Sequence, residues 1–152
     1  MVQLQIRPAT PQDLEIIVRW NILLAEESEA KKLSPQVLTK GVEQVLADPR
    51  KGRYFLAVVD GQPIGQMMIT YEWSDWRNGQ IWWIQSVYVE PESRRRGVCR
   101  ALHDHVAAEA ENDAEVVGLR LYVERNNTVA QQVYQKVGLE SAGYLVYERF
   151  FS

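Results

Sequence analysis

One short stretch of the sequence combines residue types that could bind a polyanion. It carries four arginines around a glycine: Arg94, Arg95, Arg96, Gly97 and Arg100. Before it, Val87 and Val89 alternate with more polar neighbours, which indicates a strand that Pro91 ends. From Val98 onward, apolar residues recur at helical spacing. A helix that begins at a tight basic turn presents backbone N–H groups and the positive end of its dipole, so this stretch could hold a phosphate group.

The arginines of this turn allow three interpretations: a site for a small anion such as a phosphate group, a solvated basic helix start with no ligand, or a patch that binds nucleic acid. The composition bears on this choice. The formal net charge is −3, and a mildly acidic chain with four arginines in one turn favours a small anionic ligand over a long nucleic acid. No Gly-Lys-Ser/Thr follows the turn, and a dinucleotide fingerprint needs three glycines where this turn has one. Neither of those phosphate-binding motifs is therefore present.

The elements that must position this turn follow from hydrophobic periodicity. We expect strands over residues 2–7, 53–59, 63–73, 80–89 and 116–123, with one or two more between Leu139 and Phe150. We expect helices that begin at Thr10-Pro11, at Ser34-Pro35, at Val98 and at Asn126 or Asn127. Asp60-Gly61 and Asn78-Gly79 indicate hairpin turns. This order predicts an α/β (mixed α+β) fold, with a central mixed, mostly antiparallel sheet of six to seven strands flanked by four helices.

Length and cysteine usage bound the class of protein. The 152 residues suit a single domain over residues 1–152. The one cysteine, Cys99, excludes an internal disulfide and a cysteine-cluster zinc site. His103 and His105 lie two apart on a helix and point in different directions, so we expect no metal site. Because residues 1–8 have no apolar signal core and no stretch could span a bilayer, we expect a cytoplasmic protein without membrane contact.

The basic turn is followed, one strand later, by a second motif. The turn reads Arg94-Arg95-Arg96-Gly97-Val98-Cys99, and the later segment reads Asn127-Thr128-Val129-Ala130-Gln131-Gln132-Val133-Tyr134-Gln135-Lys136-Val137-Gly138-Leu139. Together they resemble the GNAT superfamily of acyl-CoA-dependent N-acetyltransferases, whose turn is Arg/Gln-x-x-Gly-x-Gly/Ala. Its second motif is Asn-x-x-Ala-x-x-x-Tyr-(x)3-Gly-Phe, with Cys99 and Leu139 as this chain's departures. The resemblance covers nearly the whole chain and implies one acetyltransferase domain that uses acetyl-CoA.

The resemblance implies a role for each matched position. The backbone of Val87, Tyr88 and Val89 would pair with the pantetheine arm like an extra strand. The pyrophosphate of coenzyme A would be held by the turn, namely Arg94, Arg95, Arg96, Gly97, Val98, Cys99 and Arg100. Asn127 and Ala130 would lie in the cofactor site. Tyr134 would be the general acid that protonates the leaving thiolate, a step that a phenol within hydrogen-bond reach can perform.

Two of these residues have competing interpretations. Tyr134 could be an aromatic residue on the packed face of an amphipathic helix. Cys99, at a helix N-terminus beside arginines, has the surroundings of a nucleophilic thiol. It occupies the small-residue position of the motif, however, and no motif fixes a histidine beside it.

The acceptor side of the reaction is indicated by a hairpin rich in aromatic and acidic residues. Four of the five tryptophans lie within it: Trp73, Trp76, Trp82 and Trp83. Adjacent strand residues face opposite sides of a sheet, so Trp82 and Trp83 cannot share one core. Rings and carboxylates suit a substrate ammonium group, although some of them must fill the core. The candidate acceptor-binding residues are Glu72, Trp73, Asp75, Trp76 and Gln85.

This hairpin resembles most the diamine (spermidine/spermine-type) branch of the family. That branch commonly carries a glutamate at the position of Gln85, and a glutamine can hydrogen-bond but cannot take up a proton. The general base therefore stays open among Glu72, Asp75 and Glu90 acting through water, or the amine arrives neutral.

The sequence thus predicts an N-acetyltransferase that moves an acetyl group from acetyl-CoA to a primary amine of a small molecule. A polyamine or an amino-acid-like acceptor would attack directly in a ternary complex. The alternatives are a non-catalytic coenzyme A-binding sensor or interaction module, and an enzyme that acts on a protein amine. A nucleic-acid partner is not expected. The aromatic segment Tyr144–Phe151 could pair with a second chain, which would give a homodimer.

Overall fold

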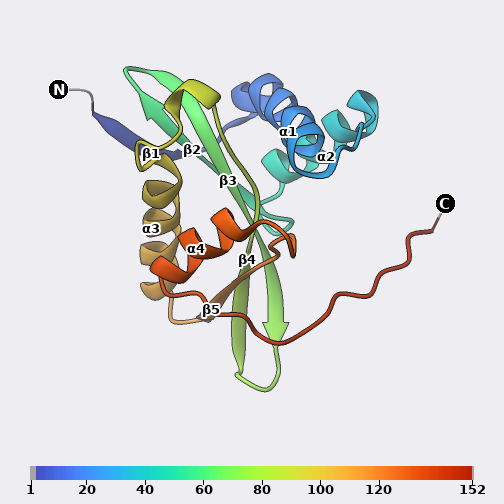
Figure 1. Ribbon diagram of the computed structural model, residues 1–152, viewed down its shortest axis with the longest axis vertical. Coiled ribbons are helices and arrows are strands. Elements are labelled where there is room, and N and C mark those ends of the chain that lie inside the picture. The colour runs from blue at the N-terminus through green and yellow to red at the C-terminus, as the bar shows by residue number, and fades with distance from the viewer. Residues whose placement is uncertain (1–2, 152) are drawn as a thin grey trace. The chain divides into compact units, whose positions relative to one another are not determined.

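The computed structural model describes residues 3–151, which form two compact units, one ending at Tyr122 and the other beginning at Val123. The first unit contains β1 (Leu4–Pro8), α1 (Leu14–Glu29), α2 (Pro35–Ala47), β2 (Arg53–Val59), β3 (Gln62–Ser74), β4 (Gly79–Val89), α3 (Val98–Glu111) and β5 (Val116–Leu121), as Figure 1 shows. The second unit contains α4 (Thr128–Lys136). The four predicted helices are all present, and Val2 of the first predicted strand lies outside the described residues.

The strands form one mixed sheet in the order β1-β2-β3-β4-β5. Neighbouring strands are antiparallel except β4 and β5, which are parallel because α3 crosses over between them. Asp60 and Asn78 adopt left-handed conformations, with φ of 49° and 50°, in the two predicted hairpin turns. The mixed, mostly antiparallel sheet is confirmed, but the predicted number of six to seven strands is wrong, because the sheet has five.

The missing strands are those predicted between Leu139 and Phe150. In the described part of the second unit, residues 139–151 contain no strand. The large apolar residues there are exposed: Tyr144, Leu145, Val146, Tyr147, Phe150 and Phe151. An apolar pattern predicts which side chains could be buried, whereas a strand also needs a neighbour for its backbone hydrogen bonds. The prediction failed on this second requirement.

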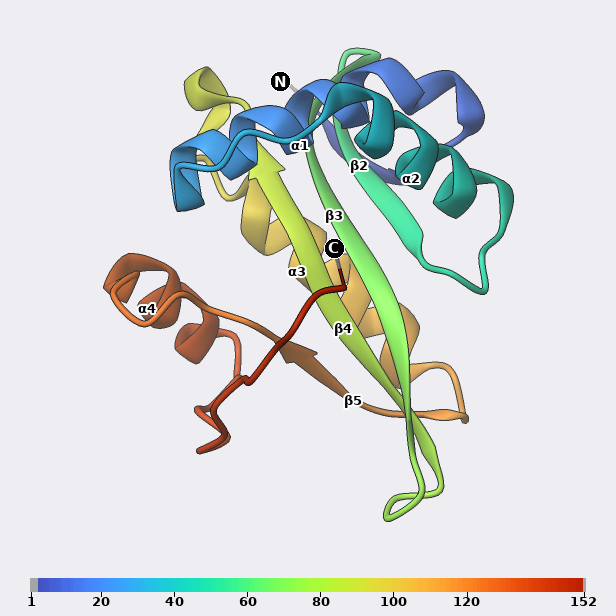
Figure 2. The ribbon, with the colours of Figure 1, turned by 90° about the vertical axis from the view of Figure 1, so that its right-hand side faces the viewer.

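Helices cover both faces of the sheet in the first unit. Figures 1 and 2 show α3 on one face and α1 and α2 on the other. On the α3 side, Leu102 and Val106 are fully buried against residues of β2, β3 and β4. On the other side, Ile17 and Trp20 of α1 pack with Leu56 of β2. No helix in the described residues is long and apolar enough to cross a bilayer.

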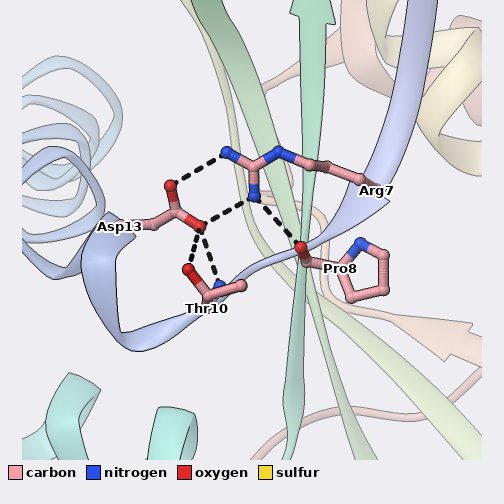
Figure 3. Close-up of polar contacts among 4 residues, drawn as sticks. All are labelled: Arg7, Pro8, Thr10 and Asp13. Carbon is pink, nitrogen blue, oxygen red and sulfur yellow. Dashed lines mark hydrogen bonds and ion pairs between the residues drawn. The ribbon is translucent and has the colours of Figure 1, made fainter.

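Caps at the helix starts fix where the chain leaves the sheet. Thr10 precedes the short 3-10 turn Pro11–Asp13 that leads into α1, and its backbone N–H donates to the Asp13 carboxylate at 2.8 Å. Arg7 donates to both oxygens of that carboxylate, at 2.8 and 3.0 Å (Figure 3). The Arg7 hydrogen bond lowers the pKa of Asp13, and the Thr10 backbone bond acts in the same direction. Ser34 caps α2 as predicted, because its Oγ accepts from the Val37 N–H at 3.3 Å.

Candidate functional site

A β-bulge divides β4 into two halves. Ser86 and Val87 of β4 together oppose the single residue Met67 of β3. Ser86 has a φ of 51°, in the left-handed region that non-glycine residues adopt at an energetic cost. Before the bulge, Trp82 and Ile84 face α3, whereas after it Val87 and Val89 do. The bulge therefore shifts the inward-facing positions from even to odd numbers, and it also turns the backbone.

Two polar side chains, Gln66 and Tyr54, hold the bulge from inside the protein. Gln66 is fully buried, and its Nε2 donates to the carbonyl oxygen of Ser86 at 3.0 Å. Its Oε1 has no hydrogen-bond partner among the described residues. The Tyr54 hydroxyl, on the side of α1 and α2, contacts Ser86 and accepts from Asn21 Nδ2 at 3.2 Å. Burial raises the pKa of Tyr54, so its hydroxyl stays protonated as a neutral hydrogen-bonding group.

Beyond the bulge, β4 has one open edge. β4 pairs with β3 up to Val89, but its ladder with β5 covers only Gln80 to Ile84. Past Ile84, no strand in the described residues lies on the β5 side of β4. The side chains of Val87, Tyr88 and Val89 point alternately into the two cores. Because these side chains are used in the cores, only the backbone edge of the three residues remains for a ligand. An extended ligand with amide groups can form hydrogen bonds with this edge.

The turn after β4 is shaped by two left-handed residues. Arg95 has a φ of 64°, and Gly97, the N-cap of α3, has a φ of 78°. A Cβ added at Gly97 would meet no atom within 4 Å, so the backbone conformation and not crowding favours glycine there. Gly97 has no side chain to cap the helix, so the first-turn amides of α3 are not covered by a capping group. This geometry suits a bound anion.

The arginine side chains of the turn have different surroundings. Arg94 is engaged within the protein, because it donates to the Val89 carbonyl at 2.8 Å and to Glu27 of α1 at 2.9 Å. Arg100 lies 3.7 Å from Asp104 on the exposed side of α3. Arg95 and Arg96 are exposed, and the described residues offer their guanidinium groups no hydrogen bond or ion pair. These two side chains are therefore available for a phosphate, whereas Arg94 fastens the turn to β4 and α1.

Cys99 is half-buried in the first turn of α3 and forms no disulfide. Its burial and its neighbour Val98, which is buried in the core, are in keeping with the small-residue position of the motif.

The second unit brings the residues of the second motif together on one helix. Asn127 caps α4, with its Oδ1 accepting from the Ala130 N–H at 3.1 Å. Gln131 Nε2 donates to the Arg125 carbonyl at 2.8 Å and holds the preceding loop against the helix. Tyr134 lies half-buried in the last part of α4. The asparagine of the motif thus has a structural task of its own, the start of the helix that carries the tyrosine.

On the acceptor side, Glu72 and Gln85 lie on the face of the sheet opposite α3. The Glu72 carboxylate accepts from Trp83 Nε1 at 2.7 Å and from Arg120 at 3.2 and 3.3 Å. Gln85 Nε2 donates to the hydroxyl of Thr70. Glu72 is thus not an isolated carboxylate, because a guanidinium group compensates its charge.

The other three candidate acceptor residues lie at the far end of the hairpin. Trp73 and Trp76 are 60% and 87% exposed, and Asp75 accepts a hydrogen bond from the backbone N–H of Trp76. The hairpin tip is separated from the bulge by the length of β4 between Gly79 and Ser86. At about 3.3 Å per residue, this separation is roughly 20 Å. The structure therefore places Gln85 beside the bulge, whereas Glu72, which lies opposite Ile81, sits farther toward the hairpin tip, as do Trp73, Asp75 and Trp76.

Sequence reasoning missed several residues around the site: Gln66, Tyr54, Trp83, Arg120 and Tyr122. Their position depends on strand register, which places Arg120 beside Trp83. The bulge itself left no mark in the sequence. Residues 81–84 are all apolar, and so are residues 87–89, so no break in a period of two can be read there.

Comparison with known proteins places these features in context. The family model described as the acetyltransferase (GNAT) family matches residues 18–139. The crystal structure of a possible acetyltransferase from Clostridium difficile 630 is 43% identical, with a TM-score of 0.92 and 98% of each chain covered. A predicted acetyltransferase from Clostridium acetobutylicum, solved with acetyl-CoA, is 21% identical, with a TM-score of 0.78 over 97% of this chain and 96% of that one.

A ribosomal-protein-alanine N-acetyltransferase from Brucella melitensis biovar Abortus 2308 is 19% identical, with a TM-score of 0.77 over 98% of this chain and 100% of that one. At these lower identities the likeness is one of fold. A search of curated proteins finds no match.

Proposed function

The chain belongs to the acetyltransferase (GNAT) family, and from this premise we propose that it transfers an acetyl group from acetyl-CoA to a primary amine of a small molecule. The family uses acetyl-CoA, and a structural neighbour was solved with it. The observation that carries the proposal is the open edge of β4 beside the bulge, which ends at the uncapped start of α3. An extended pantetheine arm fits the first feature and a pyrophosphate fits the second.

We assign the binding roles as follows. The backbone of Val87–Val89 pairs with the amides of the pantetheine arm. The first-turn amides of α3, together with the exposed side chains of Arg95 and Arg96, hold the pyrophosphate. Arg94 supports the turn through its bonds to Val89 and Glu27. The second motif supports a part for Asn127 and Ala130 in binding the cofactor.

The chemistry that we propose is direct attack of a neutral amine on the thioester carbonyl. A backbone N–H in Val87–Val89, held in place by the bulge, donates to the oxyanion that forms on this carbonyl. Tyr134 donates its phenolic proton to the departing thiolate, so that the carbon–sulfur bond breaks as the new amide bond is completed. The sequence motif supports this role for Tyr134.

The proposed acceptor is a polyamine or an amino-acid-like amine. The diamine branch has a glutamate where this chain has Gln85, and the Glu72 carboxylate is compensated by Arg120. Glu90 accepts from Trp20 Nε1 at 2.8 Å and is tied to α1 in this way, which weakens its claim as a base. We therefore propose that the amine loses its proton to water and not to a dedicated carboxylate.

We further propose a cytoplasmic homodimer. The support is the single cysteine and the exposed apolar segment Tyr144–Phe151, since apolar patches on extended segments commonly pair with a partner. Light scattering of the full chain and of a chain shortened before Tyr144 measures this directly. The full chain is expected to have twice the mass of one chain and the shortened one the mass of one chain.

Release of free thiol from acetyl-CoA tests the proposed function. The acceptors are polyamines, amino acids, aminoglycosides and a lysine peptide. Release with small amines but not with the peptide is the expected result. Release with the peptide alone would replace the small-molecule acceptor by a protein amine. Binding of acetyl-CoA, seen as a rise in melting temperature, without transfer to any acceptor would contradict the proposed activity.

A further inference from the structure

The sheet face opposite α3 carries a group of side chains that the acetyl transfer proposed above does not use. Trp83, Arg120 and Tyr122 come from neighbouring strands β4 and β5 and from the residue after β5. The ring centres of Trp83 and Tyr122 are 4.5 Å apart, and Tyr122 is 62% exposed. Glu72 of β3 completes the group through its bonds to Trp83 and Arg120. All of these residues belong to the first unit.

The ion pair in this group leaves donors unused. Only one guanidinium nitrogen of Arg120, Nη1, contacts Glu72, at 3.2 and 3.3 Å, and no other described residue accepts from this guanidinium group. The Arg120 side chain is 29% exposed. A guanidinium group has five N–H donors in a planar fork, so the remaining donors can take a carboxylate in a bidentate arrangement. Glu72 holds the Arg120 side chain without using up its donors.

Gln85, two residues after Trp83 on β4, offers a hydrogen-bond acceptor for the amine of a substrate. Gln85 follows Trp83 on the same face of β4 and adjoins the bulge at Ser86. Its Nε2 donates to Thr70, and the described residues give its Oε1 no donor. That oxygen can accept an N–H of a substrate amine. Arg120 is the register partner of Trp83, and two strand residues span about 7 Å, a distance that a small molecule can bridge through hydrogen bonds of its amine at one end and its carboxylate at the other.

We propose, on the basis of the acetyl transfer proposed above, that the acceptor is a small amino acid-like molecule whose carboxylate binds Arg120 while its amine lies between Gln85 and the bulge. An apolar side chain of the acceptor packs on the exposed ring of Tyr122, beside Trp83. The same arrangement disfavours polyamines. Their second ammonium group would meet the Arg120 cation, and the Glu72 carboxylate that could offset it is already paired.

Pairs of acceptor substrates that differ only in a carboxylate measure how much this group contributes to kcat/KM. Phenylalanine and 2-phenylethylamine differ only in that group, as do alanine and ethylamine, and spermidine represents the polyamines. We expect the amino acid of at least one pair to exceed its decarboxylated partner in kcat/KM by about tenfold or more, because charge-assisted hydrogen bonds contribute a factor of that order. Equal values in both pairs, or a preference for spermidine, would overturn the proposal.

The variant Arg120→Gln tests the residue itself. It should lower kcat/KM for the amino acid selectively, so that its ratio to the decarboxylated amine falls toward one. Arg50→Gln, which removes an exposed arginine that pairs only with Asp48 among the described residues, is the matched control and should keep the wild-type ratio. A ratio that Arg120→Gln leaves unchanged would contradict the assignment. Circular dichroism and the acetyl-CoA-induced rise in melting temperature establish that each variant is folded.

A binding measurement keeps this inference separate from the proposed function. Tryptophan fluorescence, to which Trp83 contributes, reports binding of phenylalanine or 2-phenylethylamine whether or not acetyl transfer occurs. Tighter binding of the amino acid without any transfer would refute the acetyl transfer and support the carboxylate site. Transfer to amines without such a preference in binding or in rate would refute the carboxylate site alone.

Discussion

Replacement of Gln66 by methionine should change the geometry of the site, and therefore kcat, much more than it changes the free energy of unfolding. Methionine has nearly the same volume, so the core around this fully buried position keeps its packing. The substitution removes the 3.0 Å hydrogen bond to the Ser86 carbonyl. It also removes the Oε1 atom, which has no partner among the described residues. The two changes act in opposite directions on stability.

The magnitudes can be worked from these contacts. A buried carbonyl that loses its partner costs about 1–3 kcal/mol. Removal of a buried, unpartnered amide oxygen returns about 1–3 kcal/mol. The net change in the free energy of unfolding is therefore within about 2 kcal/mol of zero, or within roughly 8 °C in melting temperature for a chain of this length. A measurement of stability alone would therefore detect little effect of Gln66→Met.

Activity should respond far more strongly. Ser86 holds a left-handed conformation that costs about 1–3 kcal/mol and persists only because its surroundings impose it. Without Gln66 the bulge can relax toward a regular ladder, which moves the backbone that we propose to bind the oxyanion. A misplacement of about 1 Å at a reacting group costs on the order of a hundredfold in rate. We expect kcat to fall about tenfold to a hundredfold.

The assay is free-thiol release from acetyl-CoA, combined with urea unfolding of the same preparation. Gln62→Met, at an exposed position at the start of β3, is the control and should match the wild type in both. A Gln66→Met protein with unchanged kcat would refute the role of the bulge. A protein that lost activity only in proportion to its unfolded fraction would assign Gln66 to stability and not to the geometry of the site.

Three further predictions concern other parts of the chain. Asp13→Asn should lower the free energy of unfolding by about 1–3 kcal/mol at pH 7, because it removes a carboxylate that Arg7 stabilises. Since folding lowers the pKa of Asp13, this contribution is present above the ordinary carboxyl pKa and is lost as the pH falls through the folded value; urea unfolding from pH 7 to pH 3 should show the variant and the wild type converging. Arg95→Ala combined with Arg96→Ala should raise KM for acetyl-CoA about tenfold or more with little change in kcat, and an unchanged KM would remove both side chains from the phosphate site. Tyr134→Phe should lower kcat by roughly a hundredfold in thiol release, and turnover equal to wild type at every pH would exclude its role as the acid.

Helix starts and hairpin turns of this protein could be predicted from a few adjacent residues. Thr10-Pro11 and Ser34-Pro35 predicted two helix starts, and the structure has caps at both. Asp60-Gly61 and Asn78-Gly79 predicted two hairpin turns, and each turn contains a left-handed residue. These features depend on a few adjacent residues with defined backbone preferences, which is why sequence reasoning reaches them.

Contacts between residues of different strands could not be predicted from the sequence. The contact of Arg120 with Glu72 depends on the register of β5 against β4 and of β4 against β3, residues far apart in the chain. The bulge at Ser86 and its support by Gln66 and Tyr54 were not predicted, because they depend on contacts between strands. The predicted closing strands failed for a related reason, since alternation in residues 139–150 does not specify a hydrogen-bonding neighbour.

The sequence by itself determined the order of the elements from β1 to α4, the basic turn at the start of α3 and the family. Each of these rests on short-range patterns and residue identity. The tertiary structure decided which arginine of the turn is free for a phosphate, since Arg94 is taken up by Val89 and Glu27. It also decided that the Glu72 carboxylate pairs with the guanidinium group of Arg120. The physical reason is that hydrogen bonds and ion pairs depend on distances of a few ångströms between side chains, and the register of the sheet sets those distances.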